Sequence, residues 1–185
     1  MGIFNLFGRK SAAPRTDIIW MTSKAMLNGC IKFLTENKPD MYIAWFEDTA
    51  EKFNRFLNEE NKMNITIRMA NSLQPYQLDN KKILFLEHYP LYSKEDYLLT
   101  GNKPLRIYFI NSLNDTIFQI FGGNIAQVMK SMGLEENDSI ENSLISKSIV
   151  NAQKRLEKKV PDDFYARTGE EWLYNYRTYF QQNIQ

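Results

Sequence analysis

The chain has 185 residues, of which 43% are hydrophobic and 14% aromatic, and this is enough apolar material for the core of one ordinary domain. Its 23 lysines and arginines balance 22 aspartates and glutamates, so no surplus of charge draws nucleic-acid phosphate or an acidic membrane to the whole surface. A general polyanion binder is therefore excluded as the expected class.

The sequence contains one cysteine, Cys30, and one histidine, His88, which excludes an internal disulfide and any familiar zinc spacing. No apolar run reaches the roughly 18 to 20 residues of a membrane-spanning helix. The N-terminus also lacks the order of segments that defines a signal peptide. We therefore expect a cytoplasmic protein in a reducing compartment, without a membrane span.

Residues 1–15 are expected to form a mobile arm, because glycine and proline interrupt a stretch too short to pack by itself. The apolar segment 3–7, followed by Arg9 and Lys10, leaves open a weak contact with a membrane interface or a partner groove. Ordered structure is expected to begin near Thr16.

Strand-like and helix-like segments then alternate as far as Ile110. The strands at 41–46 and 83–87 are apolar at consecutive positions, as in strands covered on both faces by helices. Such alternation predicts a parallel sheet. The expected strands are 17–21, 41–46, 65–70, 83–87 and 105–110, and the expected helices between them are 23–36 and 48–61.

The turn after Phe46 predicts a helix start with its own cap. Asp48 occupies the position of an N-cap, and Glu51 follows three residues later as in a capping box. Together with Glu47 these carboxylates follow the end of a strand, where α/β proteins place ligands, so a hydrated cation is an alternative interpretation. We favour the cap and a solvated first turn, and expect no metal ligands.

Beyond Ile110 the pattern is helical and predicts no further strand. The expected helices are 114–121, 125–132, 143–159 and 170–183. A boundary near Gly133 separates an α/β domain, residues 16–133, from a helical extension, residues 134–185. Apolar stripes should dock the two last helices against the sheet. The stripes are Ile145, Ile149, Ala152 and Leu156 in one helix, and Trp172, Tyr176 and Phe180 in the other.

The C-terminal aromatic residues outnumber what one helical face can bury. They are Phe164, Tyr165, Trp172, Tyr174, Tyr176, Tyr179 and Phe180. Exposed aromatic side chains are typical of protein interfaces. With Trp172, Tyr176 and Phe180 assigned to the interior, Tyr174 and Tyr179 are the candidate anchors for a protein partner.

Two single residues invite a catalytic interpretation. His88 beside Glu87 suggests a general base with its orienting partner, but adjacent residues of an extended chain point apart and no nucleophile is near, so a structural role is expected. Cys30 lies on the apolar face of its helix and is expected to be a buried hydrophobic residue.

Residues 112–122 read Ser-Leu-Asn-Asp-Thr-Ile-Phe-Gln-Ile-Phe-Gly, a Ser-x-x-Asp motif before an apolar helix and a Phe-Gly pair. Met-Lys-Ser-Met-Gly at 129–133 and Asn-Ala-Gln-Lys-Arg-Leu-Glu at 151–157 follow in order. The region 105–157 resembles the SecA preprotein translocase where its second motor domain enters the helical scaffold. Upstream, residues 41–57 and 83–90 resemble helicase-type second motor domains in architecture only.

The resemblance implies a three-layer RecA-like α/β fold, with a mainly parallel sheet of about five strands and a C-terminal helical extension. In such motors a helix after the late strand carries arginines that stabilise charge on the transferred phosphate. The corresponding residues 94–101 contain no arginine, the family's Gly-Arg-Gly-Thr-Asp nucleotide loop is missing, and none of the eight glycines forms a phosphate loop. We therefore expect no ATPase activity, no catalytic residues and no cofactor.

The favoured interpretation is a non-catalytic SecA-like accessory or protein-interaction module. The alternative is a degenerate helicase-type module that assists a nucleic-acid motor supplied in trans, and an enzymatic role would need a second chain to supply the phosphate loop. A net charge of +1 favours protein contacts over nucleic acid. A basic stripe along the carboxyl end of the sheet would favour the alternative. The sequence indicates neither the identity of the partner nor an oligomeric state.

Overall fold

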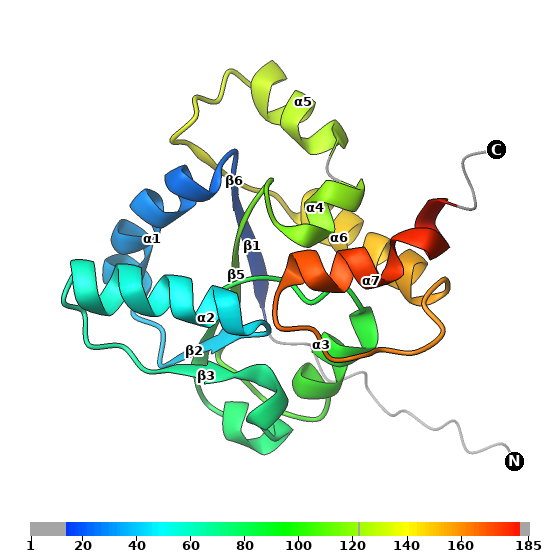
Figure 1. Ribbon diagram of the computed structural model, residues 1–185. Helices are drawn as coiled ribbons and strands as arrows, with labels where there is room; N and C mark the ends of the chain where they lie inside the picture. Colours follow the sequence, from blue (N-terminus) through cyan, green and yellow to red (C-terminus); the bar gives the residue numbers. More distant parts are fainter. Residues whose placement is uncertain (1–13, 122, 182–185) are drawn as a thin grey trace, which may run out of the picture.

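The structure is a computed structural model that describes residues 14–121 and 123–181. Six strands form one sheet in the order β3-β2-β4-β5-β1-β6 (Figure 1). The strands are β1 Arg15–Trp20, β2 Met41–Ala44, β3 Ile67–Met69, β4 Lys82–Phe85, β5 Arg106–Ser112 and β6 Ser139–Glu141. All neighbours pair in parallel except β6, which is antiparallel to β1. The predicted mainly parallel α/β fold is confirmed.

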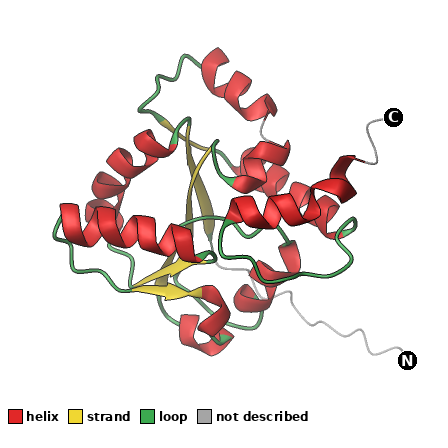
Figure 2. Ribbon diagram, viewed as in Figure 1, coloured by secondary structure: helices red, strands yellow, loops and turns green. Residues whose placement is uncertain are grey.

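The helices lie on both faces of this sheet (Figure 2). They are α1 Ser23–Asn37, α2 Glu47–Asn54, α3 Tyr92–Leu99, α4 Thr116–Phe121, α5 Gly123–Ser131, α6 Ser143–Glu157 and α7 Gly169–Gln181. A π-helical segment, Arg55–Glu60, continues α2, and short 3₁₀ turns lie at Ala70–Ser72 and Pro75–Leu78. Within the described residues, no helix is long and apolar enough to cross a membrane.

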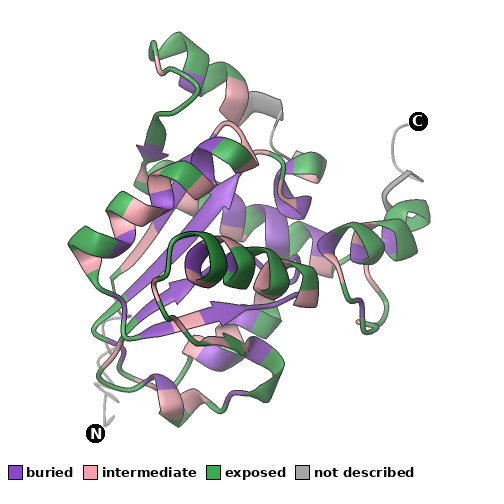
Figure 3. Cartoon of the chain, turned by 60° about the vertical axis from the view of Figure 1, so that its left-hand side comes forward, coloured by how far each residue is buried: buried purple, intermediate pink, exposed green. Residues whose placement is uncertain are grey.

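Alternate residues of the central strands belong to two separate hydrophobic clusters, because successive side chains of a strand point to opposite faces of the sheet. Ile18, Leu84 and Ile110 pack with α1 and α2, whereas Ile83 and Phe109 pack with helices α3 to α7. Figure 3 shows the strands as a mostly buried layer between the helices. The result is a three-layer architecture consistent with a RecA-like fold.

The C-terminal helices share the core of the sheet. Ile149 and Leu156 of α6 belong to the same buried cluster as Phe85 and Phe109, and so do Trp172 and Tyr176 of α7. The predicted docking of both stripes is thus confirmed for these residues, while the side chain of Phe180 lies outside the described residues. The boundary near residue 133 stays a prediction about domains.

One element contradicts the sequence analysis. The prediction that no strand follows Ile110 is wrong, because β6 pairs with β1 at Ile18, Ile19 and Trp20. This strand has three residues, and only Ile140 among them is buried. So short a segment shows no recognisable alternation, which is why the sequence did not reveal it.

Candidate functional site

The carboxyl end of the sheet is the place where folds of this kind bind ligands. The loops that follow β1, β2, β4 and β5 lie together there, because these four strands are consecutive and parallel in the sheet. The candidate site comprises the polar groups in these four loops. The C-terminal segment before α7 also reaches this end, through Arg167.

Glu87, which follows β4, organises the start of α2. Its Oε1 accepts the backbone N–H groups of Trp45 and Phe46 at 3.0 and 2.9 Å, and its Oε2 accepts the hydroxyl of Thr49 at 2.6 Å. The predicted N-cap role of Asp48 is therefore wrong: the N-cap residue is Phe46, which offers no capping side chain. The two carboxylate oxygens of Glu87 bind the two residues just before the helix and the side chain of Thr49, from a position beyond the reach of a local capping motif.

The Glu87 carboxyl group is almost fully buried. Burial raises the pKa of Glu87 to about 8, although the hydrogen bonds from Thr49, Phe46 and Trp45 oppose that shift. The nearby carboxyl group of Asp115 adds to the increase. A titratable group of this kind at the ligand-binding end of a sheet is a feature that functional sites share with buried structural networks.

Arg167, in the segment before α7, binds the start of α2 at the same end of the sheet. Its carbonyl oxygen accepts the N–H groups of Glu47 at 3.0 Å and Asp48 at 3.5 Å, the first backbone donors of α2. Its guanidinium contacts Glu47 at 3.3 Å and Glu51 at 2.6 Å. The acidic group considered as a cation site is thus paired with an arginine. Among the described residues, no group of three or more His, Cys, Asp or Glu side chains is placed to hold a metal ion.

The Ser-x-x-Asp motif lies where β5 ends. Asp115 accepts the backbone N–H of Ser112 at 2.8 Å and its hydroxyl at 2.7 Å. The hydroxyl of Ser112 lies 3.1 Å from that of Ser23, and the N–H of Ser23 donates to Asn114 at 3.0 Å. Burial raises the pKa of Asp115. The motif therefore ties the end of β5 to the starts of α1 and α4.

The carboxyl end of the sheet is therefore acidic, and its described polar groups bind one another within the chain. A phosphate group binds where backbone N–H groups are free to donate and the local field is positive. Here the donors at the start of α2 bind Glu87 and the Arg167 carbonyl, and the donors near α1 and β5 bind Asn114 and Asp115. The described donors at this end of the sheet therefore have acceptors within the chain.

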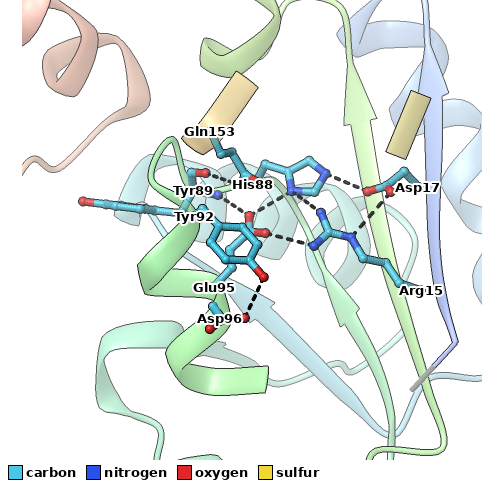
Figure 4. A network of polar contacts seen from close by, with 8 residues as sticks. All are labelled: Arg15, Asp17, His88, Tyr89, Tyr92, Glu95, Asp96 and Gln153. Atoms are coloured by element: carbon cyan, nitrogen blue, oxygen red, sulfur yellow. Dashed lines mark hydrogen bonds and ion pairs between the residues drawn. The ribbon is translucent and has the colours of Figure 1, made fainter. Parts of the chain in front are cut away.

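A second polar centre surrounds His88 (Figure 4). The ring contacts Asp17 through Nε2 at 2.7 Å and Glu95 through Nδ1 at 2.8 Å, and both carboxylates also contact Arg15. Glu87 is therefore not the orienting partner of His88. The sequence analysis missed Arg15, Asp17 and Glu95, although an aspartate within a buried apolar strand is itself a signal that a charged partner is near.

Tyr174 and Tyr179 project from α7, with 67% and 42% of their surface exposed. Trp172 and Tyr176 of the same helix are buried, as expected. The guanidinium of Arg177 lies 5.0 Å from the centre of the Tyr174 ring. The role of the two exposed tyrosines in binding a partner stays a prediction. Cys30 is fully buried, and burial raises the pKa of its thiol to about 12.

No family model matches the chain. Part of it is similar to proteins named Protein translocase subunit SecA. The match is 43% identical over 60 residues in Psychrobacter cryohalolentis, 50% over 50 residues in Clostridium botulinum and 49% over 51 residues in Christiangramia forsetii. These segments cover 32%, 26% and 27% of this chain, but only 6%, 6% and 5% of those proteins.

The chain is an α/β protein with a mainly parallel sheet between two helical layers, consistent with a RecA-like fold. The comparisons then identify one region of this chain as SecA-related.

Proposed function

We propose that the chain is a non-catalytic accessory module, related to the second motor domain of SecA and the start of its helical scaffold, that acts by binding another protein in the cytoplasm. The observation that carries this proposal is the self-paired carboxyl end of the sheet. There the N–H groups of Trp45, Phe46 and Glu47 bind oxygens of the chain itself. A phosphate-binding site would need such N–H donors to be free.

The residues of α3 support the same conclusion. In helicase-type motors the corresponding helix supplies arginines, and one arginine finger is worth about 10³ to 10⁵ in rate. Helix α3 contains no arginine, and its Lys94 pairs with Asp163 at 3.0 Å. Arg167, the arginine at the carboxyl end of the sheet, is bound by Glu47 and Glu51. Both features disfavour stabilisation of a transferred phosphoryl group.

Binding of a protein partner is supported by the aromatic surface around α7. Phe164 and Tyr165 are exposed in the loop before this helix, and Tyr174 and Tyr179 are exposed on the helix itself. Large, rigid aromatic side chains bury much area at little cost in rotamer entropy. The relatives are named as subunits of a protein translocase, which agrees with a role among protein partners.

The alternative role, assisting a nucleic-acid motor in trans, would be supported by a basic stripe along the carboxyl end of the sheet. Carboxyl groups of Glu47 and Glu51 stand there instead, and Arg167 is paired with both. Close carboxylates repel the phosphates of a nucleic acid backbone. The charge distribution therefore favours the protein-binding role.

The proposal is tested by titrating the purified chain with fluorescent ATP and magnesium, beside an ATPase with a phosphate loop as positive control. We expect no saturable binding at micromolar concentration and no hydrolysis above the rate without protein. Saturable micromolar binding would show that other residues rebuild the nucleotide site, and would overturn the non-catalytic assignment.

A further inference from the structure

A group of buried charged side chains is assembled around the one histidine of the chain. His88 follows β4, Asp17 and Arg15 lie on β1, and Glu95 lies on α3. The His88, Asp17 and Glu95 side chains are almost completely buried, and that of Arg15 is 19% exposed. Charges in such surroundings need close partners of opposite sign.

The geometry favours the protonated ring. Both nitrogens face carboxylate oxygens, Nε2 at 2.7 Å from Asp17 and Nδ1 at 2.8 Å from Glu95. A neutral imidazole carries one N–H and would direct a lone pair at one of these oxygens, whereas an imidazolium donates to both. The Glu95 oxygen concerned also accepts the N–H of Tyr89 at 2.9 Å.

Neighbouring strands and helices supply the charged groups that determine the pKa of His88. Arg15 lies 3.6 Å from Asp17, 3.4 Å from Glu95 and 3.3 Å from Nδ1 of His88. The His88 ring and the Arg15 guanidinium both stack on the Phe109 ring of β5, at 4.2 and 4.3 Å from its centre.

Three further groups complete these surroundings. On α6, Ser146 and Lys147 line the same surface hollow as Arg15. The charge of the ring also reaches Asp115, which follows β5. Burial by itself lowers the pKa of His88, but Glu95 and Asp17 outweigh it and raise that pKa.

The same segment fastens the C-terminal helices to the sheet. The carbonyl of Tyr89 accepts Gln153 of α6 at 2.8 Å, and the Tyr89 hydroxyl donates to Asp163 at 2.7 Å. Asp163 also accepts the indole N–H of Trp172 at 3.0 Å. At the start of α3, the N–H of Ser93 donates to Glu157 of α6 at 3.0 Å.

We propose that the His88 group is a proton-controlled lock, which holds α3, and through it α6 and the segment before α7, on the parallel sheet. With the proton present, two cations face two carboxylates, and the group is neutral. Loss of the proton leaves one uncompensated negative charge in the core, so α3 opens first while the central strands stay paired. The proposal rests on the fold and is independent of the proposed function.

The direction of the pH effect follows from linkage. A histidine whose pKa is higher in the closed than in the open state stabilises the closed state fully below its ordinary pKa, near 6.5, and that contribution is lost as the pH rises to the raised value. Within this interval the closing equilibrium weakens by about tenfold for each pH unit. Above the raised pKa, the loss levels off.

The experiment uses the full chain and two NMR observables. Because the chain contains a single histidine, its ring C–H resonance reports His88 without assignment. Amide hydrogen exchange, corrected for the intrinsic effect of pH, is followed in α3, α6 and the central strands β2, β4 and β5. We expect a ring midpoint above 6.5, protection in α3 and α6 that falls by about tenfold per unit up to that midpoint, and protection in the strands that exceeds that of α3 at every pH.

His88→Gln should remove this pH dependence, and Tyr97→Ala, on the exposed surface of α3, should leave it intact. A ring midpoint at or below 6.5 would overturn the proposal, and so would protection in α3 that stays constant with pH or equals that of the strands. These wild-type measurements decide the question even where His88→Gln fails to fold.

Discussion

Replacing Trp172 by alanine tests whether the C-terminal helix is part of the core. The indole is fully buried, packs against Tyr176 with ring centres 4.6 Å apart, and donates to Asp163. Removing a buried tryptophan costs about 3 to 5 kcal/mol, because the transfer energy is lost and a cavity remains. Asp163 keeps the hydroxyl of Tyr89 and the ammonium of Lys94 as partners, so no unpaired charge adds to this cost.

For a chain of this length, such a loss lowers the melting temperature by roughly 6 to 20 °C, at about 2 to 4 °C per kcal/mol. Urea unfolding followed by circular dichroism measures the free energy. The matched variant is Tyr174→Ala, two positions along the same helix, which removes a side chain that is 67% exposed and should change stability by no more than about 0.5 kcal/mol. A loss below about 1 kcal/mol for Trp172→Ala, or equal losses for both variants, would refute the packing of α7 on the sheet.

Gly29→Ala should lower the free energy of unfolding by about 1 to 3 kcal/mol, because the added Cβ would lie 2.6 Å from the indole nitrogen of the buried Trp20. The control is Asn28→Ala, which changes an exposed neighbour on the same helix. Equal free energies of unfolding for the two variants would contradict the close approach of α1 to β1. The pKa of Glu87 is raised to about 8 in the fold, so its protonated form contributes stability that is fully present below about pH 4.5 and is lost progressively up to pH 8. Glu87→Gln removes this titration, and its free energy of unfolding should therefore fall less steeply over that interval than that of the wild type. A slope equal to that of wild type would show that Glu87 does not titrate there.

The sequence was sufficient to predict the parallel sheet and most of its helices. Strands such as Met41–Ala44 and Lys82–Phe85 are buried on both faces, and a continuous apolar run between polar helices is a strong local signal of that environment. The stripe that includes Ile149 and Leu156 also predicted correctly which face of α6 is buried. These features depend on residues close together in the chain.

The contacts that define the two polar centres could not be predicted in this way, because they join distant residues. Glu87 reaches Trp45 across two neighbouring strands, and His88 meets Asp17 only after β1 is inserted beside β5. Local capping rules assigned the N-cap of α2 to Asp48, since they cannot include the Arg167 carbonyl, which accepts the N–H groups of Glu47 and Asp48 from a distant part of the chain. Pairing of buried charges is decided by topology rather than by sequence spacing.

We propose that the chain binds a protein partner through exposed aromatic residues and without using ATP. Affinity capture from native cytosol tests this proposal by comparing wild type with the Tyr174→Ala, Tyr179→Ala double variant and with Tyr76→Ala, which changes a tyrosine that is 72% exposed elsewhere on the surface.

We predict a partner that binds equally well with and without ATP and is retained by Tyr76→Ala. Its affinity for the double variant should fall by about thirtyfold or more, since one true anchor is worth about 2 kcal/mol. Unchanged affinity of the double variant, or capture that requires ATP, would contradict the claim.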